Sequence, residues 1–319
     1  MKVSKVLLII VIIFSLFLVS CAKKAIVPIT RPAEINLVGI KRIAMGDITG
    51  NAGTALSDIL TQKLFESGRY EVLDRQNINA LMREHNLNLS GAVDEATAVK
   101  IGGLLGTSAM IFGSSNGQYS QKTEIGQRYS CGSKREPSVC QEYKKIGQGR
   151  ISTTLKVVDL KTGKIVAIKN FSEQGSDSAS ENNEWPPDLD QDVIMGKILN
   201  TTAAQFMKMI APYTDFVSVE FDDDSKMPEV NAGIESAQKG LWDSASIQFK
   251  NAVDRNPSDA AAWYNLGLAY MYTYRFDDAI QAFNRSNSIK PSSKCSQEIA
   301  NCNSLRAEKK KLDAQMTDK

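Results

Sequence analysis

An early stretch of the chain alternates short apolar runs with amphipathic segments, and this alternation constrains the fold more than any other feature of the sequence. The apolar runs predict three strands, at residues 41–46, 71–74 and 109–113. Apolar residues at helical spacing fill the segments between them, and Gly68 and Gly106 end two of the three expected helices. Strands that alternate with helices predict an α/β fold, a mixed sheet with packed helices.

The alternation resumes after residue 150. Apolar side chains at every second position from Ile151 to Val157 predict a strand, and a turn at 161–164 leads into a second strand that extends the sheet. Asp190 can cap a helix that follows. Its expected apolar stripe consists of Ile194, Ile198, Thr202, Phe206 and Ile210.

Several blocks of this region resemble the curli production assembly/transport (CsgG-type) lipoprotein family. The blocks are Gly68–Arg75, Asn86–Gly91 and Lys100–Gly113, and Leu155–Ile165 resembles a β-hairpin of that family. The resemblance implies a CsgG-like periplasmic α/β domain over residues 38–213.

The N-terminus has the pattern of a secretion signal. Lys2 and Lys5 precede an apolar run, Val6–Val19, which is shorter than the ~20 residues that a membrane-spanning helix needs. The junction Leu18–Cys21 resembles a bacterial lipobox, which implies cleavage after residue 20 and lipid on Cys21. Because Ala22 stands where aspartate would retain the protein on the inner membrane, the resemblance implies the periplasmic face of the outer membrane.

Two further segments predict connections without regular structure. Residues 21–37 contain Pro28 and Pro32 and show no sustained period, so we expect a tether there. The acidic run Asp222–Asp224 predicts a solvated linker over 214–228.

A repeat with a period of 34 residues follows the linker. Gly233, Ala245, Phe249, Ala252 and Pro257 are matched 34 positions later by Gly267, Ala279, Phe283, Ser286 and Pro291. The second unit resembles a tetratricopeptide repeat, which implies an all-α module of paired helices. We expect two repeats over 229–293 and a capping helix with tail over 294–319. Tyr272 and Tyr274, expected to be exposed, are the candidate partner-binding anchors.

The cysteines predict one disulfide and leave a second pair open. Apart from Cys21, they form the local pairs Cys131/Cys140 and Cys295/Cys302, and an oxidising compartment favours pairing. Turn-forming residues lie between the first two. The second two, on one regular helix, would be roughly 10 Å apart along its axis, which exceeds disulfide reach. That pair therefore needs a bend in the helix or stays reduced.

The sequence offers no recognisable catalytic site. The chain has one histidine, His85, without an evident partner, and it lacks a Cys-x-x-Cys motif, so we expect neither enzyme activity nor a metal. The glycine-rich loop Gly46–Gly53 has no following lysine, so we expect no nucleotide cofactor. Without the leader, 36 basic and 36 acidic residues balance, which gives no reason to expect a nucleic acid partner.

The resemblance also raises the question of a membrane channel. In the family's founding member, two hairpins of each subunit enter the outer membrane, and they would correspond here to residues 114–152 and 170–192. The first carries Glu142, Lys144 and Lys145, and the second contains Glu173–Glu184, expected to be a polar loop without a strand period. Because one lysine facing lipid near the midplane costs about 2–4 kcal/mol, we expect both segments to stay in water.

These patterns predict an outer-membrane-tethered periplasmic lipoprotein that serves as an assembly or scaffold factor for an envelope or secretion machine. Its expected partners are envelope proteins, the membrane through the lipid anchor, and further copies of the same chain. Two other functions stay open: a secretion-channel subunit for curli-like export, and an activator of cell-wall synthases.

Overall fold

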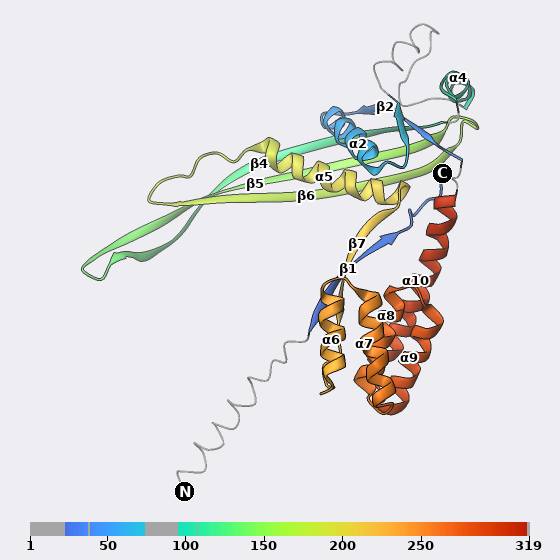
Figure 1. The fold of residues 1–319 in the computed structure, drawn as a ribbon. Helices are drawn as coiled ribbons and strands as arrows, with labels where there is room; N and C mark the ends of the chain where they lie inside the picture. The colour runs from blue at the N-terminus through green and yellow to red at the C-terminus, as the bar shows by residue number, and fades with distance from the viewer. Residues whose placement is uncertain (1–22, 38, 74–94, 107, 318–319) are drawn as a thin grey trace. The chain divides into compact units, whose positions relative to one another are not determined.

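A computed structural model describes residues 23–37, 39–73, 95–106 and 108–317 (Figure 1). The chain divides into two compact units. The first consists of residues 32–213 with 314–319 and is called the α/β unit. The second consists of the chain up to Arg31 with residues 214–313 and is called the repeat unit. None of the described helices is long and apolar enough to cross a membrane.

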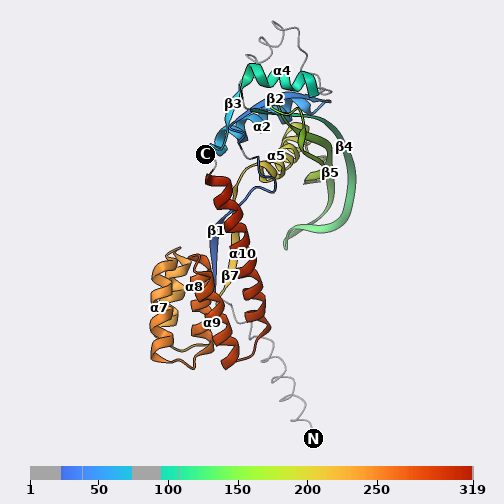
Figure 2. The ribbon, with the colours of Figure 1, turned by 90° about the vertical axis from the view of Figure 1, so that its right-hand side faces the viewer.

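The α/β unit is built on a five-stranded mixed sheet (Figure 2). The strand order is β3-β2-β4-β5-β6. The first three strands run parallel, and β4, β5 and β6 are antiparallel to one another. The bounds are β2 (Arg42–Thr49), β3 (Glu71–Leu73), β4 (Ser108–Ser133), β5 (Glu136–Asp159) and β6 (Ile165–Asn182). The predicted mixed sheet with packed helices is thus confirmed.

Helices cover both faces of this sheet. Helices α2 (Gly53–Ser67) and α5 (Gln191–Ile210) pack on one face, where Ile43 is fully buried. Helix α4 (Glu95–Leu105) packs on the other face, against the fully buried Met110. Asp190 caps α5 by accepting hydrogen bonds from two backbone N–H groups, and the predicted apolar stripe of that helix is buried.

Glycines let α5 approach the long strands closely. A Cβ at Gly147 would lie 2.8 Å from Ile194 Cδ1, and a Cβ at Gly149 would lie 2.8 Å from Ile198 Cδ1. Gly175 stands opposite Gly149 on β6 and meets Ile198 in the same way. At these three positions α5 therefore packs directly on the strand backbone.

The expectation of a polar loop at Glu173–Glu184 is wrong, because β6 continues to Asn182 and pairs with β5 along its length. The helix-facing positions of these strands include glycines, while the opposite face is polar and exposed. No apolar alternation is therefore needed to form the strand, and the usual period-two signal is missing from the sequence.

The two ends of the α/β unit are joined by backbone hydrogen bonds. Ile35 N donates to Met209 O at 2.9 Å, and Glu34 N donates to Lys208 O at 3.3 Å. The segment that enters this unit and the end of α5 are consequently side by side.

The repeat unit combines a two-stranded sheet with helix pairs. Its strands are β1 (Lys24–Arg31) and β7 (Tyr213–Glu220), and its helices are α6 (Pro228–Gln238), α7 (Trp242–Arg255), α8 (Ala260–Tyr272), α9 (Phe276–Ile289) and α10 (Ser293–Thr317). A Cβ at Gly233 would lie 2.5 Å from the Phe249 ring, and one at Gly267 would lie 2.6 Å from the Phe283 ring. The 34-residue period of the sequence is thus repeated in the packing, as predicted for tetratricopeptide repeats.

The expected tether and linker both contain strands. Within residues 21–37, β1 buries Ala25, Val27 and Ile29 against the helices, and within 214–228 lies most of β7. Proline at position 28 is compatible with β1 because it lies on an exposed position of a strand at a sheet edge. Cys21 and His85 lie outside the described residues.

Two neighbouring glycines of α4 provide a matched test of close packing. A Cβ at Gly102 would lie 2.2 Å from the backbone oxygen of Leu160, whereas nothing lies within 4 Å of one at Gly103. We expect Gly102→Ala to lower the free energy of unfolding of the α/β unit by about 1–3 kcal/mol. Gly103→Ala should leave it unchanged or raise it by up to about 1 kcal/mol. Thermal unfolding monitored by circular dichroism separates the two, and equal effects would contradict this packing.

Candidate interaction surfaces

The long strands present a face of polar side chains on the side away from α5. Strand register aligns Gln118, Arg150 and Gln174 in one row across β4, β5 and β6, and Ser120, Gln148 and Ser176 in the next. All six are exposed. We call these six residues the polar strand face.

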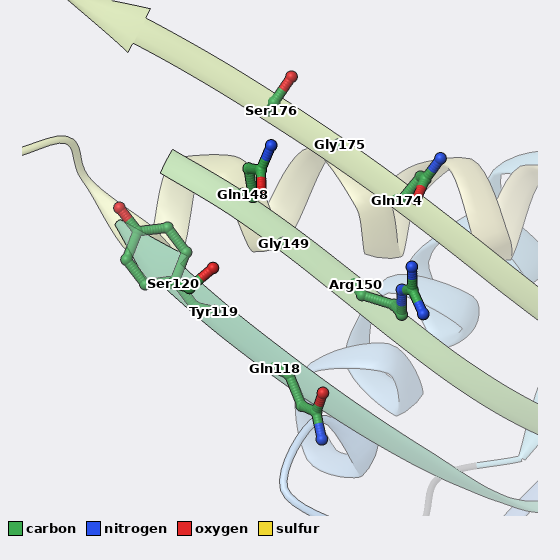
Figure 3. Close-up of a pocket in the computed structure, with 9 residues that line it drawn as sticks. All are labelled: Gln118, Tyr119, Ser120, Gln148, Gly149, Arg150, Gln174, Gly175 and Ser176. Atoms are coloured by element: carbon green, nitrogen blue, oxygen red, sulfur yellow. The ribbon is translucent and has the colours of Figure 1, made fainter. Parts of the chain in front are cut away.

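A cavity of ≈ 870 Å³ lies at the polar strand face, whose residues line it together with Tyr119, Gly149 and Gly175 (Figure 3). The view shows the lining residues on the three strands with α5 behind them. Amide, hydroxyl and guanidinium groups supply both donors and acceptors there, and Arg150 brings the one formal charge among the lining residues. This chemistry suits hydrogen bonding to a polar surface.

The segment between β6 and α5 packs on the opposite side of the same strands. Asp188 accepts hydrogen bonds from Lys145 Nζ and Gln121 Nε2, both at 2.8 Å. The hydrogen bond from Lys145 is the main cause that lowers the pKa of the Asp188 carboxyl, and Gln121 adds to it. Trp185 contacts the Tyr143 ring edge-on, with 4.8 Å between ring centroids. These contacts fix the return of the chain to α5.

A disulfide joins Cys131 and Cys140 near the far end of the β4–β5 hairpin, with a Cα–Cα distance of 5.7 Å. Cys295 and Cys302 are free and buried on α10, seven residues apart on one continuous helix. The sequence left their state open, and in the structure both thiols contribute to the core of the repeat unit.

The face formed by α6, α8 and α10 is covered by other segments of the same chain. The buried Asn265 of α8 accepts a hydrogen bond from Asp222 N at 3.0 Å and donates one to Asp222 O at 2.7 Å. At α6, Gln238 Nε2 donates to Lys24 O at 3.0 Å, and at α10, Lys294 forms an ion pair with Glu220 at 3.2 Å. The β1–β7 ribbon and the segment after it therefore occupy the face formed by α6, α8 and α10.

The two candidate tyrosines differ in their surroundings. Tyr272 is not an exposed anchor, because its ring packs on Trp242 with 5.0 Å between centroids and burial raises its pKa. Its partly buried side chain packs against the core of the repeat unit. Tyr274 is 43% exposed and adopts a left-handed backbone conformation with φ 61°. Lys309 Nζ lies 5.5 Å from the centroid of its ring.

No group of three or more His, Cys, Asp or Glu side chains within the described ranges is placed to hold a metal ion. A second cavity, of ≈ 370 Å³, lies in the repeat unit between the segment after β7 and the start of α10. Both lysines that line it are already paired, since Lys290 contacts Asp224 at 2.7 Å and Lys294 contacts Glu220. This cavity is part of the covered helix face.

The Asn265 side chain should stabilise the repeat unit through its two hydrogen bonds to Asp222. Asn265→Ala leaves the partly buried backbone N–H and carbonyl of Asp222 without these bonds, so we expect a loss of about 1–3 kcal/mol of unfolding free energy. Gln297→Ala, on an exposed position of α10, is the control and should stay within about 0.5 kcal/mol. Chemical denaturation followed by tryptophan fluorescence measures both. A loss no larger than that of the control would contradict the role of Asn265.

Protonation of Glu298 should make the repeat unit more stable in mild acid than at neutral pH. Burial is the main cause that raises the pKa of its carboxyl, and hydrogen bonds from Asn301 and Tyr264 oppose it. The folded pKa exceeds the unfolded one, so burial of the charged carboxylate destabilises the fold in full above the folded pKa. This destabilisation is relieved as pH falls through the folded pKa and the carboxylate is protonated. Glu298→Gln should therefore raise stability at neutral pH and flatten this part of the pH profile. Denaturation at a series of pH values tests this, and an unchanged profile in the variant would contradict it.

Comparison with known proteins finds one matching family model in the α/β unit and one in the repeat unit. Residues 36–183 match the family model described as "Curli production assembly/transport component CsgG", and residues 260–293 match the tetratricopeptide repeat model. No curated protein matches the chain in sequence.

Similar solved structures share little sequence with the chain. The LpoB C-terminal domain from Salmonella enterica is 11% identical with a TM-score of 0.27, over 42% of this chain and 85% of that one. Lipoprotein GNA1162 from Neisseria meningitidis is 13% identical with a TM-score of 0.26, over 52% and 97%. A PelC dodecamer from Paraburkholderia phytofirmans is 10% identical with a TM-score of 0.27, over 59% and 98%. The assignment therefore depends on the two family models and on the observed topology: the chain carries a CsgG-type domain followed by a tetratricopeptide repeat.

Proposed function

We propose that the protein is a periplasmic lipoprotein, held at the outer membrane through lipid on Cys21, and that it acts as an assembly or scaffold factor for an envelope or secretion machine. The lipobox-like junction and the match to the CsgG family model support the compartment. The repeat module supports a role in protein–protein contacts. In this proposal the protein positions other proteins and catalyses no reaction.

The observation that carries this proposal is the polar strand face. Strands of 26, 24 and 18 residues extend the sheet and present aligned amide and hydroxyl groups to solvent. The packing of α5 uses the other side of these strands, so the fold does not explain the polar strand face. A broad surface that offers many hydrogen bonds and little charge fits a protein partner.

The repeat unit supplies a second contact site in this proposal. Its covered helix face leaves the outer helix surfaces and the turn that contains Tyr274 for a partner. An aromatic side chain flanked by a cation, as Tyr274 is by Lys309, is typical of interface anchors.

One observation favours the second candidate, a secretion-channel subunit built from several copies. Two strand edges have no partner among the described strands. One is the edge of β6 that faces away from β5, and the other is the edge of β4 that faces away from β5, from the residue after Ser114 onward. Such edges can pair between copies of the chain. Against a lipid-facing role, charged side chains such as Lys144 and Lys145 occupy both faces of β5.

Charge reversal at the polar strand face tests the first candidate. Cross-linking in cells followed by affinity capture and mass spectrometry should identify envelope proteins bound to the wild type. In Arg150→Glu we expect recovery of the partner at this face to fall about tenfold, which corresponds to 1.4 kcal/mol. Lys161→Glu makes the same charge change in the exposed β5–β6 turn and should leave recovery unchanged. Equal recovery from both variants would contradict a role of this face.

The oligomeric state separates the two candidates. A channel subunit should form rings that survive loss of the lipid anchor, so the Cys21→Ala protein should be oligomeric in light scattering. A Cys21→Ala protein that is soluble and monomeric would remove the channel candidate.

A further inference from the structure

One side of β1, the first strand of the repeat unit, packs against the helices. Ala25, Val27 and Ile29 are buried against the helices, and Phe221 N donates a hydrogen bond to Lys23 O at 2.9 Å. Because side chains alternate along a strand, β1 must direct Lys24, Ile26 and Pro28 away from the helices.

The neighbouring strand adds to this outward face. Lys24 forms an ion pair with Glu220 at 3.7 Å and Arg31 one with Asp215 at 3.5 Å, so β1 and β7 run antiparallel. This places Phe216 across from the middle of β1. Ile26 and Phe216 are 60% and 69% exposed. The outward face of the ribbon thus carries two exposed large apolar side chains, with Lys24 at one end.

The length of chain before β1 limits where this face can lie. Only Ala22 and Lys23 stand between Cys21 and β1, and an extended chain spans at most about 3.6 Å per residue. Lys24 must therefore lie within about 11 Å of a lipidated Cys21. A free tether over residues 21–37 would instead reach an average of about 23 Å and would leave the orientation open.

We propose that the outward face of the β1–β7 ribbon, formed by Lys24, Ile26, Pro28 and Phe216, is a membrane-contact surface that lies in the headgroup region of the bilayer. The proposal depends on the proposed lipid on Cys21. Isoleucine and phenylalanine enter the boundary between headgroups and acyl chains, while lysine contacts anionic headgroups. Glu220, paired with Lys24 and Lys294, is the acidic group closest to Lys24 on this face. In this proposal the lipid and the outward face of the ribbon together hold the repeat unit at the membrane surface.

Photo-cross-linking in vesicles tests this surface. The mature chain, residues 21–319, is coupled through the Cys21 thiol to a maleimide lipid in vesicles of phosphatidylethanolamine and phosphatidylglycerol. Cys295 and Cys302 are buried, and Cys131 and Cys140 are bonded, so Cys21 is the thiol open to coupling. Benzoylphenylalanine replaces Phe216 in one variant and Ile247, which is 60% exposed on α7 of the same unit, in the control.

We expect on the order of tenfold more lipid cross-links at position 216 than at position 247, because an interfacial side chain is buried ~5–10 Å into the headgroup boundary. A Gly-Ser insertion of about 20 residues after Ala22, which adds about 25 Å of average reach, should reduce the cross-links at 216 several-fold. Similar lipid cross-linking at the two positions would overturn the proposal. In cells, cross-links from position 216 to a protein in place of lipid would overturn it as well.

The natural modification is measured separately. Mass spectrometry of the protein from the bacterial envelope shows whether Cys21 carries lipid. Its absence would overturn the proposed lipoprotein function, whereas the vesicle experiment still decides whether the ribbon face contacts a bilayer when the chain is held at residue 21. The two failures are therefore distinguishable.

Discussion

The repeat unit depends on the pairing of β1 with β7, two strands between which the sheet and helices of the α/β unit are inserted in the chain. Two helical repeats are fewer than the about three that a solenoid needs to bury a core. Here the ribbon supplies the missing apolar surface, with Ala25, Val27, Ile29 and Val219 in the same cluster as Phe249. The N-terminal segment is therefore a structural part of the C-terminal module.

In the α/β unit, the packing of α5 on the long strands determines which side of those strands is apolar. Three strands extend beyond the parallel part of the sheet, and α5 covers one side of them. Glycine at positions 147, 149 and 175 brings the helix close enough for its isoleucines to contact the strand backbone. The opposite side then needs no apolar residues for the fold, and its polar side chains are free to serve binding. A single arrangement thus explains both the close helix and the polar strand face.

The sequence predicts those parts of the structure whose packing leaves a periodic apolar signal. The parallel strands, the α5 stripe and the 34-residue repeat are of this kind, and each is found in the structure. The long strands are missed because glycine replaces apolar side chains under α5, and the polar strand face is missed with them. β1 is missed because it contains Pro28, and because the exposed Ile26 interrupts the alternation of buried apolar and exposed polar residues. Tyr272 is misjudged because a position next to a turn does not show which way the ring points.

The hydrogen bonds between residues 34–35 and 208–209 have a consequence for the order of folding. The entropy lost on joining two distant strands depends on how far apart the intervening chain holds their ends. Once the α/β unit has folded, these bonds bring its entry and exit together, which shortens the effective loop between β1 and β7. The ribbon then forms as if it were closing a short hairpin. In this order of events β1 completes its fold after the α/β unit, and a chain with an unfolded α/β unit would expose the apolar side of β1 to proteases.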